Sequence, residues 1–196
     1  MEKLRQNHKC AVQEEVNSMH WYDKLAGYFP EHEMKHRGQM EELLSHHDAY
    51  RKHETKDYLV TYAEFHDFIF IDYLLVYPTT RGKGLGSQVL NQFKQREKTI
   101  ILEVEPPDAE DHDTVKRIRF YEKNGFRKAE HIEYTRSDED GTPYTMDIYY
   151  WPPDDVSEQS ILKKMALVCR EIHNFRALKY YGRIIADPDD VLNWAH

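Results

Sequence analysis

FIFIDYLLVYPTTRGKGLG, residues 68–86, is the stretch that decides the fold. Its first ten residues form an apolar run that predicts a buried strand, which Pro78 ends. After the turn, apolar residues at helical spacing predict a helix, beginning with Leu85. Backbone N–H groups at a helix N-terminus bind anions, and the charges of Arg81 and Lys83 lie beside them. The stretch therefore predicts a strand, a glycine-rich phosphate-binding turn and a helix.

The turn does not match the common nucleotide-binding motifs. It lacks the Lys-Ser/Thr ending of a P-loop, and its glycines do not fit the G-x-G-x-x-G register. A second landmark follows where residues 120–126 read FYEKNGF. Residues 113–124 predict a helix whose core face includes Ile118 and Tyr121, and Gly125 supplies the left-handed residue that ends it.

Together these segments resemble the two landmarks of the Gcn5-related N-acetyltransferases, the GNAT superfamily. Arg81, Gly84 and Gly86 occupy the defining places of its Arg/Gln-x-x-Gly-x-Gly/Ala motif, and residues 121–126 resemble its helix ending in Tyr-x-x-x-Gly-Phe. The resemblance covers about residues 50–151. It implies a mixed α/β fold with a central, mostly antiparallel, twisted sheet that splays between the fourth and fifth strands. Helices would flank the sheet, with an added C-terminal helix in this chain.

The sequence divides into a predicted acetyltransferase domain, residues 1–151, and a predicted helical extension, residues 152–196. In the domain, residues 9–47 have helical patterns broken at Phe29-Pro30, and residues 1–8 would make a poor version of the family's first strand. The core, residues 50–151, predicts strands over 58–65, 68–77 and 99–105, then a hairpin of 127–135 with 144–151. We expect the extension to pack on the domain or on the partner in a homodimer.

The resemblance implies acetyl-CoA as the acyl donor. Its pyrophosphate would lie on the backbone N–H groups of Gly82, Lys83, Gly84, Leu85, Gly86 and Ser87, with Arg81 alongside. The pantetheine arm would pair with the exposed edge of the buried strand at Leu74, Leu75 and Val76. Family members often carry an asparagine seven residues before the helix tyrosine. Thr114 stands at that cofactor-contacting position here and departs from the pattern.

The implied reaction is transfer of the acetyl group to a primary amine, either a small cationic amine or an amino-terminal or lysine amine. An alkylammonium has a pKa near 10 and must lose a proton before it attacks, and the departing thiolate must gain one. The resemblance makes Tyr121 the proton donor. Two candidates remain for the base, Asp72 and Glu103, which are acidic residues inside otherwise apolar strands. Glu105 leaves the same face of its strand as Glu103.

Composition limits the partners and the location. The net charge of −8 argues against a nucleic-acid or anionic-membrane partner. The two cysteines, Cys10 and Cys169, have neither metal-binding nor disulfide spacing. The sequence has no signal-peptide pattern and no apolar run long enough for a membrane span. We expect a cytoplasmic protein that uses acetyl-CoA and requires no metal.

Two alternatives have support in the sequence. The string HEMKH matches the zinc-protease motif H-E-x-x-H through His32, Glu33 and His36, and on a helix both imidazoles would share a face. The string is short for a chain with 12 histidines, its flanks do not continue as in metzincins, and Lys35 and Arg37 favour a solvated helix face. The long helical flanks favour the second alternative, a GNAT-fold protein that binds CoA or acyl-CoA without catalysis.

Overall fold

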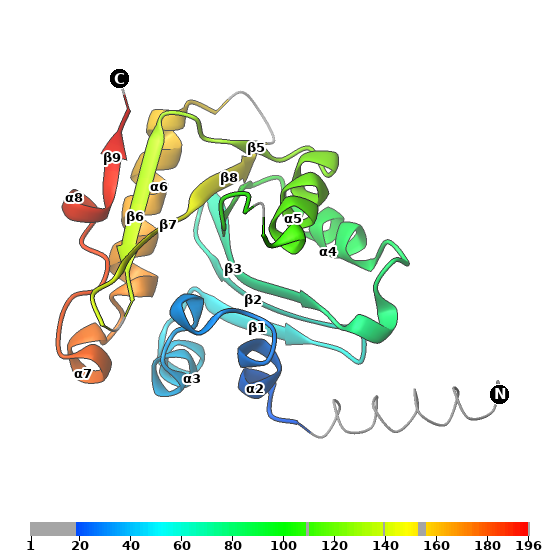
Figure 1. Ribbon diagram of the computed structural model, residues 1–196, viewed down its shortest axis with the longest axis horizontal. Helices are drawn as coiled ribbons and strands as arrows, with labels where there is room; N and C mark the ends of the chain where they lie inside the picture. The colour runs from blue at the N-terminus through cyan, green and yellow to red at the C-terminus, as the bar shows by residue number, and fades with distance from the viewer. Residues whose placement is uncertain (1–18, 109, 139, 153–155, 196) are drawn as a thin grey trace.

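The computed structural model describes residues 19–108, 110–138, 140–152 and 156–195 (Figure 1). Its α-helices are α2 (Trp21–Ala26), α3 (Arg37–His46), α4 (Leu85–Lys94), α5 (His112–Lys123), α6 (Glu158–Val168), α7 (Ala177–Tyr181) and α8 (Pro188–Val191). Two 3₁₀ turns and one π-helical turn are η1 (Glu31–Glu33), η2 (Pro78–Thr80) and η3 (Cys169–His173). The strands are β1 (Tyr50–Glu54), β2 (Tyr58–Glu64), β3 (Phe68–Val76), β4 (Thr99–Val104), β5 (Arg127–Lys128), β6 (Ile132–Ser137), β7 (Pro143–Thr145), β8 (Asp147–Trp151) and β9 (Leu192–Trp194).

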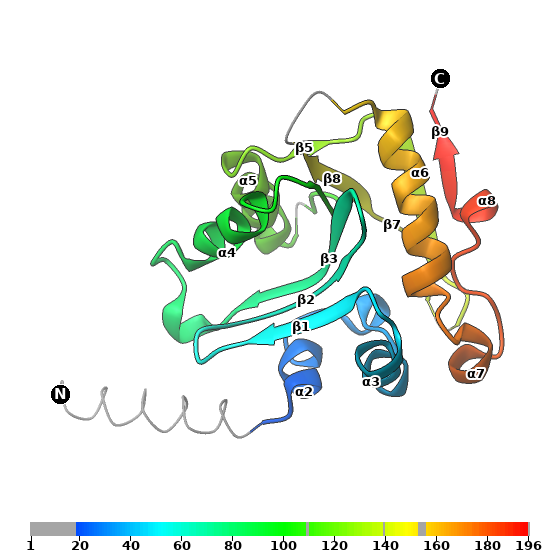
Figure 2. The same cartoon turned by 180° about the vertical axis from the view of Figure 1, so that it is seen from behind.

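Six strands form the central sheet in the order β1-β2-β3-β4-β8-β5. Neighbouring strands are antiparallel except β3 and β4, which run parallel. The twisted sheet lies between α4 and α5 on one side and α2 and α3 on the other (Figures 1 and 2). This mixed α/β architecture with a mostly antiparallel sheet confirms the predicted fold class.

The apolar run of β3 exists because both faces of this strand are covered. Ile69 and Ile71 pack with side chains of α4 and α5. Phe68 and Phe70 pack on the opposite face, with side chains of α3 and α6. Successive side chains of a strand alternate between faces, so a strand covered on both faces needs an uninterrupted apolar run. The predicted buried strand is confirmed over Phe68–Val76.

A β-bulge at Asp72 opens the sheet. Thr61 of β2 pairs with Tyr73 and Tyr62 pairs with Ile71, so Asp72 is the extra residue on β3. β3 pairs with β4 only from Phe68 to Ile71, and beyond the bulge this edge of β3 has no β4 partner. The predicted splay therefore lies between β3 and β4. The expected numbering, fourth and fifth, counts one more strand at the start of the domain, and residues 1–8, which would make a poor version of it, lie outside the described residues.

The C-terminal extension shares the core of the domain. Ile161 and Met165 of α6 belong to the apolar cluster that contains Phe68 and Phe70. The extension contains the predicted helices, but it also contains β9, which pairs with β6 in a second sheet of order β7-β6-β9. The predicted hairpin is also divided, since β5 pairs with β8 and β6 pairs with β7. β6 turns away from the main sheet to meet a strand about 60 residues later, and no local pattern signals such a pairing.

The N-terminal helices are shorter than the sequence predicted. α2 ends at Ala26, and the predicted break at Phe29-Pro30 is confirmed, because a loop and η1 follow before α3 begins at Arg37. Residues 9–18 of the predicted helical block lie outside the described residues. In the described parts of the chain, no helix combines the length and the apolar character that crossing a membrane would need.

Candidate active site

The glycine-rich turn between β3 and α4 presents free backbone at the start of a helix. Gly82 has φ 80° and Gly84, the residue that caps α4, has φ 74°. Side chains are strained in this left-handed region, so glycine is needed at both positions. No atom lies within 4 Å of a Cβ built on either glycine. The first N–H groups of α4 have no partners within the helix, which makes this open turn a ready anion site.

A groove of about 410 Å³ runs from this turn along the splayed edge of β3. One wall is formed by Leu74 and Val76 of β3, together with the turn. The opposite wall is α5, and the loop after α2 closes one side with Tyr28 and Phe29. Gly86 allows α4 and α5 to approach, because a Cβ on it would lie 2.8 Å from the Phe120 ring. The volume falls in the range of ligand-binding clefts.

Most of the predicted cofactor residues line this groove, namely Leu74, Val76, Arg81, Gly82, Gly84, Leu85, Gly86 and Ser87. Arg81 donates from Nε to the carbonyl oxygen of Val76 at 3.1 Å, and its guanidinium lies 4.7 Å from the centre of the Tyr28 ring. The side chain of Leu75 instead packs with α2 and α3 on the other face, and Lys83 is exposed outside the lining.

Thr114 lies away from the groove, contrary to the expectation of a cofactor contact. Its hydroxyl donates to the carbonyl oxygen of Asp111 at 2.7 Å and accepts from the N–H of Asp108 at 2.9 Å. It therefore orders the loop before α5. Arg117 lines the groove instead, a residue that the sequence analysis missed. Its position one turn before Tyr121 on the same helix face was the available signal.

A small inner cavity of about 40 Å³ lies beside the groove, where β3 and β4 diverge. Four residues line both the groove and the cavity: Phe29, Leu74, Arg117 and Tyr121. The Tyr121 side chain is 8% exposed, and burial raises the pKa of its phenol to about 12. Tyr121 is therefore protonated at neutral pH and can donate a proton at the junction of the two spaces.

Asp72, one candidate base, is held on both carboxylate oxygens. Oδ1 accepts from Lys35 Nζ at 2.5 Å, and Oδ2 accepts from the Tyr50 hydroxyl at 2.5 Å. The Lys35 and Asp72 side chains are 2% and 3% exposed. This buried ion pair joins the loop before α3 to the bulge of β3. The arrangement favours a structural role for Asp72.

Glu103, the other candidate base, is bonded to a histidine and paired with an arginine. Burial lowers the pKa of His173 to about 4, so the histidine is a neutral donor. Its Oε1 lies 2.8 Å from His173 Nε2, and its Oε2 accepts from Arg136 Nη1 at 3.4 Å. Burial alone would raise the pKa of Glu103, but the hydrogen bond from His173 and the charge of Arg136 hold it well below its usual range. A carboxyl that holds a proton so weakly is a poor base. His173 and Arg136 come from η3 and β6, far from β4 in sequence.

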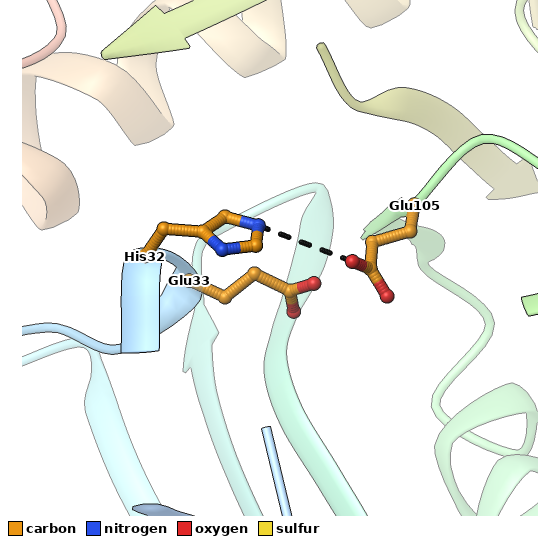
Figure 3. Close-up of side chains that lie close together, drawn as sticks. All are labelled: His32, Glu33 and Glu105. Atoms are coloured by element: carbon orange, nitrogen blue, oxygen red, sulfur yellow. Dashed lines mark ion pairs between the residues drawn. The ribbon is translucent and has the colours of Figure 1, made fainter. Parts of the chain in front are cut away.

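Glu33, Glu105 and His32 meet at the edge of the inner cavity (Figure 3). One ring nitrogen of His32 and one carboxylate oxygen from each glutamate all lie within 4.8 Å of one another. Glu105 lies 3.9 Å from His32 Nε2 and accepts from Arg117 Nη1 at 3.1 Å. Burial, and then the negative charge of Glu105, raises the pKa of Glu33 to about 8. Glu33 was predicted only as part of the zinc-protease string.

The zinc-protease interpretation is not supported by the geometry. His32 lies in η1 and His36 caps the N-terminus of α3, so the two imidazoles do not share a helix face. His36 Nδ1 accepts from the Gly38 N–H at 3.1 Å, and its ring stacks on Tyr180 with centroids 4.8 Å apart. The predicted solvated face is also wrong at Lys35, which is buried. The helix expected over this string is interrupted because η1 ends at Glu33.

The chain is similar, along most of its length, to proteins described as acetyltransferases. Residues 49–128 match the family model described as "Acetyltransferase (GNAT) domain". A curated protein of Bacillus subtilis (strain 168), "Putative acetyltransferase YjbC", is 43% identical over 176 residues, which are 89% of this chain and 92% of that protein. The solved structure "Putative acetyltransferase from GNAT family from Bacteroides thetaiotaomicron" has the same fold, with a TM-score of 0.64, 19% identity and coverage of 92% of this chain and 96% of its own. The chain therefore belongs to the GNAT family of acetyltransferases and is an acyltransferase.

Proposed function

We propose that this enzyme transfers an acetyl group from acetyl-CoA to a small cationic primary amine. The observation that carries the proposal is the meeting of the groove and the inner cavity at Tyr121. A donor thioester in the groove and an amine in the cavity would approach one another there. Proximity of this kind converts a reaction between two molecules into one within a complex.

The residues of the groove fit acetyl-CoA. The open glycine turn and the N-terminus of α4 suit a pyrophosphate, and Arg81 adds a positive charge. Beyond Ile71 this edge of β3 has no β4 partner in the described chain, which suits an extended amide-containing arm near Leu74, while Arg81 holds the carbonyl oxygen of Val76. Acetyl-CoA supplies an acyl group activated as a thioester. Tyr121 would donate its proton to the departing sulfur.

The size and charge of the inner site support a primary ammonium as the acceptor. A cavity of about 40 Å³ admits an unsubstituted ammonium group, which is little larger than a water molecule. An outer basin of about 440 Å³ adjoins the cavity through Tyr144 and Met146, which line both. Glu105, Asp108 and Asp111 line this basin, and their charges would attract a cation.

The test combines acetyl-CoA binding with transfer to a panel of amines. Titration calorimetry should give about one equivalent of acetyl-CoA per chain. Thiol release should then depend on an acceptor from a panel of 1,4-diaminobutane, spermidine and the ε-amine of Nα-acetyl-lysine. Binding without transfer to any amine of the panel would refute a small cationic amine as the acceptor, and failure to bind acetyl-CoA would refute the proposed donor.

A matched pair of glycine variants tests the position of the donor. Gly84→Ala and Gly182→Ala introduce the same backbone strain, because the two glycines have φ 74° and 68° and open space around them. Both variants should lose stability by about 1 kcal/mol. Only Gly84→Ala should also weaken acetyl-CoA binding, by about tenfold or more. Equal affinities in the two variants would contradict the placement of the pyrophosphate on this turn.

A further inference from the structure

We propose that Glu33 is the base of the reaction and removes a proton from the acceptor ammonium before the amine attacks. This inference rests on the proposed acetyl transfer and concerns a residue outside both family landmarks. Four carboxylates lie in or beside the inner cavity, namely those of Glu33, Asp72, Glu103 and Glu105. Their hydrogen bonds and ion pairs distinguish them.

Three of the four carboxylates are stabilised by cations. Asp72 is paired with Lys35, and Glu103 is paired with Arg136. Glu105 is held by Arg117 Nη1 at 3.1 Å and lies near His32. The oxygens of these three carboxylates are already engaged by neighbouring side chains. These three residues are therefore better suited to hold the site together than to accept a proton.

Glu33 differs because one of its oxygens is uncommitted. Its Oε1 is buried and has no hydrogen-bond partner among the described residues. The backbone that carries it is fixed, because the Tyr73 hydroxyl donates to the Glu33 carbonyl oxygen at 2.7 Å and accepts from the Lys35 N–H at 3.0 Å. The carboxyl group points toward Glu105 (Figure 3). Glu33 lines the inner cavity, which Tyr121 also lines. A buried acceptor atom of this kind is costly without a partner, and an ammonium would supply the missing donor.

The surroundings of Glu33 also match the task of a base. Burial and the charge of Glu105 raise its pKa from 4.5 to about 8, and Arg117 offsets part of that effect. Since an alkylammonium has a pKa near 10, the raised value favours proton transfer by about three orders of magnitude over an ordinary carboxylate. Charged and titratable groups surround it on several elements. They are Glu103 in β4 and Glu105 just after it, Arg117 and Tyr121 on α5, Arg136 on β6, Tyr144 on β7, Asp72 on β3, His32 on η1 and Lys35 in the loop after it.

The protons balance with Glu33 and Tyr121 at the two ends of the transfer. Glu33 takes one proton from the ammonium, and the freed amine forms a bond to the acyl carbon. The carbon–sulfur bond breaks, and Tyr121 gives its proton to the sulfur. The nitrogen then loses its second proton, which restores the Tyr121 phenol through water. Glu33 releases its proton to solvent, so the net products are the amide, the thiol and one proton.

The pH dependence of Glu33→Gln tests the proposal directly. In the wild-type enzyme, kcat/KM for the best amine of the panel should rise with pH and inflect near 8, where Glu33 ionises. Glu33→Gln should lower kcat/KM by about 10²- to 10⁴-fold and lose this inflection. Its acetyl-CoA affinity should stay within about threefold. A variant that keeps both the rate and the inflection would overturn the assignment.

Two comparisons separate a base from a merely structural role. Glu31→Gln makes the same substitution in the same turn at an exposed position, and it should leave the rate and the pH profile unchanged. An acceptor whose own pKa lies below the assay pH arrives already deprotonated. The defect of Glu33→Gln should therefore shrink with such an amine. A defect of the same size for both kinds of acceptor would refute a role in proton removal.

A stability measurement distinguishes failure of this inference from failure of the proposed function. The folded state holds the Glu33 proton up to about pH 8, whereas the unfolded chain releases it near 4.5. Wild-type stability from this group is therefore lost as pH rises between these values. The melting temperature of Glu33→Gln should exceed that of wild type by about 10–15 °C at pH 9 and by little at pH 5. If the difference in melting temperature between Glu33→Gln and wild type did not change with pH, the assignment would be overturned even if no amine were turned over. If the variant gained stability with pH as expected but wild type were inactive with every amine, only the proposed function would be refuted.

Discussion

Asp72→Asn should destabilise the protein strongly, because it leaves the buried Lys35 ammonium without its counter-ion. The two side chains are 3% and 2% exposed and their atoms lie 2.5 Å apart. Removing one partner of a buried ion pair costs about 3–5 kcal/mol. The asparagine can still accept a hydrogen bond, and Glu103 also lines the same cavity. We therefore expect a loss near the lower end, about 3 kcal/mol, or roughly 10 °C in melting temperature.

Urea unfolding followed by circular dichroism measures this loss. Lys35→Met together with Asp72→Asn removes both charges, so the double variant should recover at least half of the stability. Asp67→Asn is the matched control, because Asp67 pairs with Lys164 at the surface with 60% of its side chain exposed. That variant should lose less than about 1 kcal/mol.

Asp72→Asn also tests whether Asp72 is the base. A loss of stability below about 1 kcal/mol, combined with a fall in transfer rate above about 10²-fold, would refute the structural role. It would restore Asp72 as the base. The opposite pattern, a large loss of stability with a smaller effect on the rate of the folded fraction, is the one that the ion pair predicts.

Two further predictions concern tyrosines. Tyr121→Phe should slow acetyl transfer by about 10²-fold and leave acetyl-CoA affinity nearly unchanged, because it removes only the proton donor; thiol-release kinetics and calorimetry measure the two effects, and an unchanged rate would remove Tyr121 as the acid. Tyr73→Phe should cost about 1–3 kcal/mol in urea unfolding, because the carbonyl oxygen of Glu33 and the N–H of Lys35 lose their partner. Tyr58→Phe, which removes a hydroxyl 3.1 Å from His53 Nδ1 at the sheet edge, should cost less, and an equal loss would contradict the importance of the η1 anchor.

Local features of the site were predictable from the sequence because neighbouring residues produce them. The turn at residues 81–86 needs glycine where φ is positive, as found at Gly82 and Gly84. The helix that carries Tyr121 follows from the spacing of its apolar residues, and Gly125, with φ 77°, ends it as predicted. The long apolar run of β3 indicated a strand covered on both faces. Each of these predictions depends on interactions within about ten residues.

The sequence by itself therefore determined the donor turn, the helix that carries Tyr121 and the sheet edge beside them. Only the tertiary structure decided which carboxylates are free, because their partners come from distant segments. Lys35 lies 37 residues from Asp72, and His173 lies 70 residues from Glu103. No residue spacing encodes such pairs, since burial and charge compensation arise only when the chain has packed. For the same reason Glu33, which the sequence offered as part of a zinc motif, becomes the uncommitted carboxyl of the inner cavity.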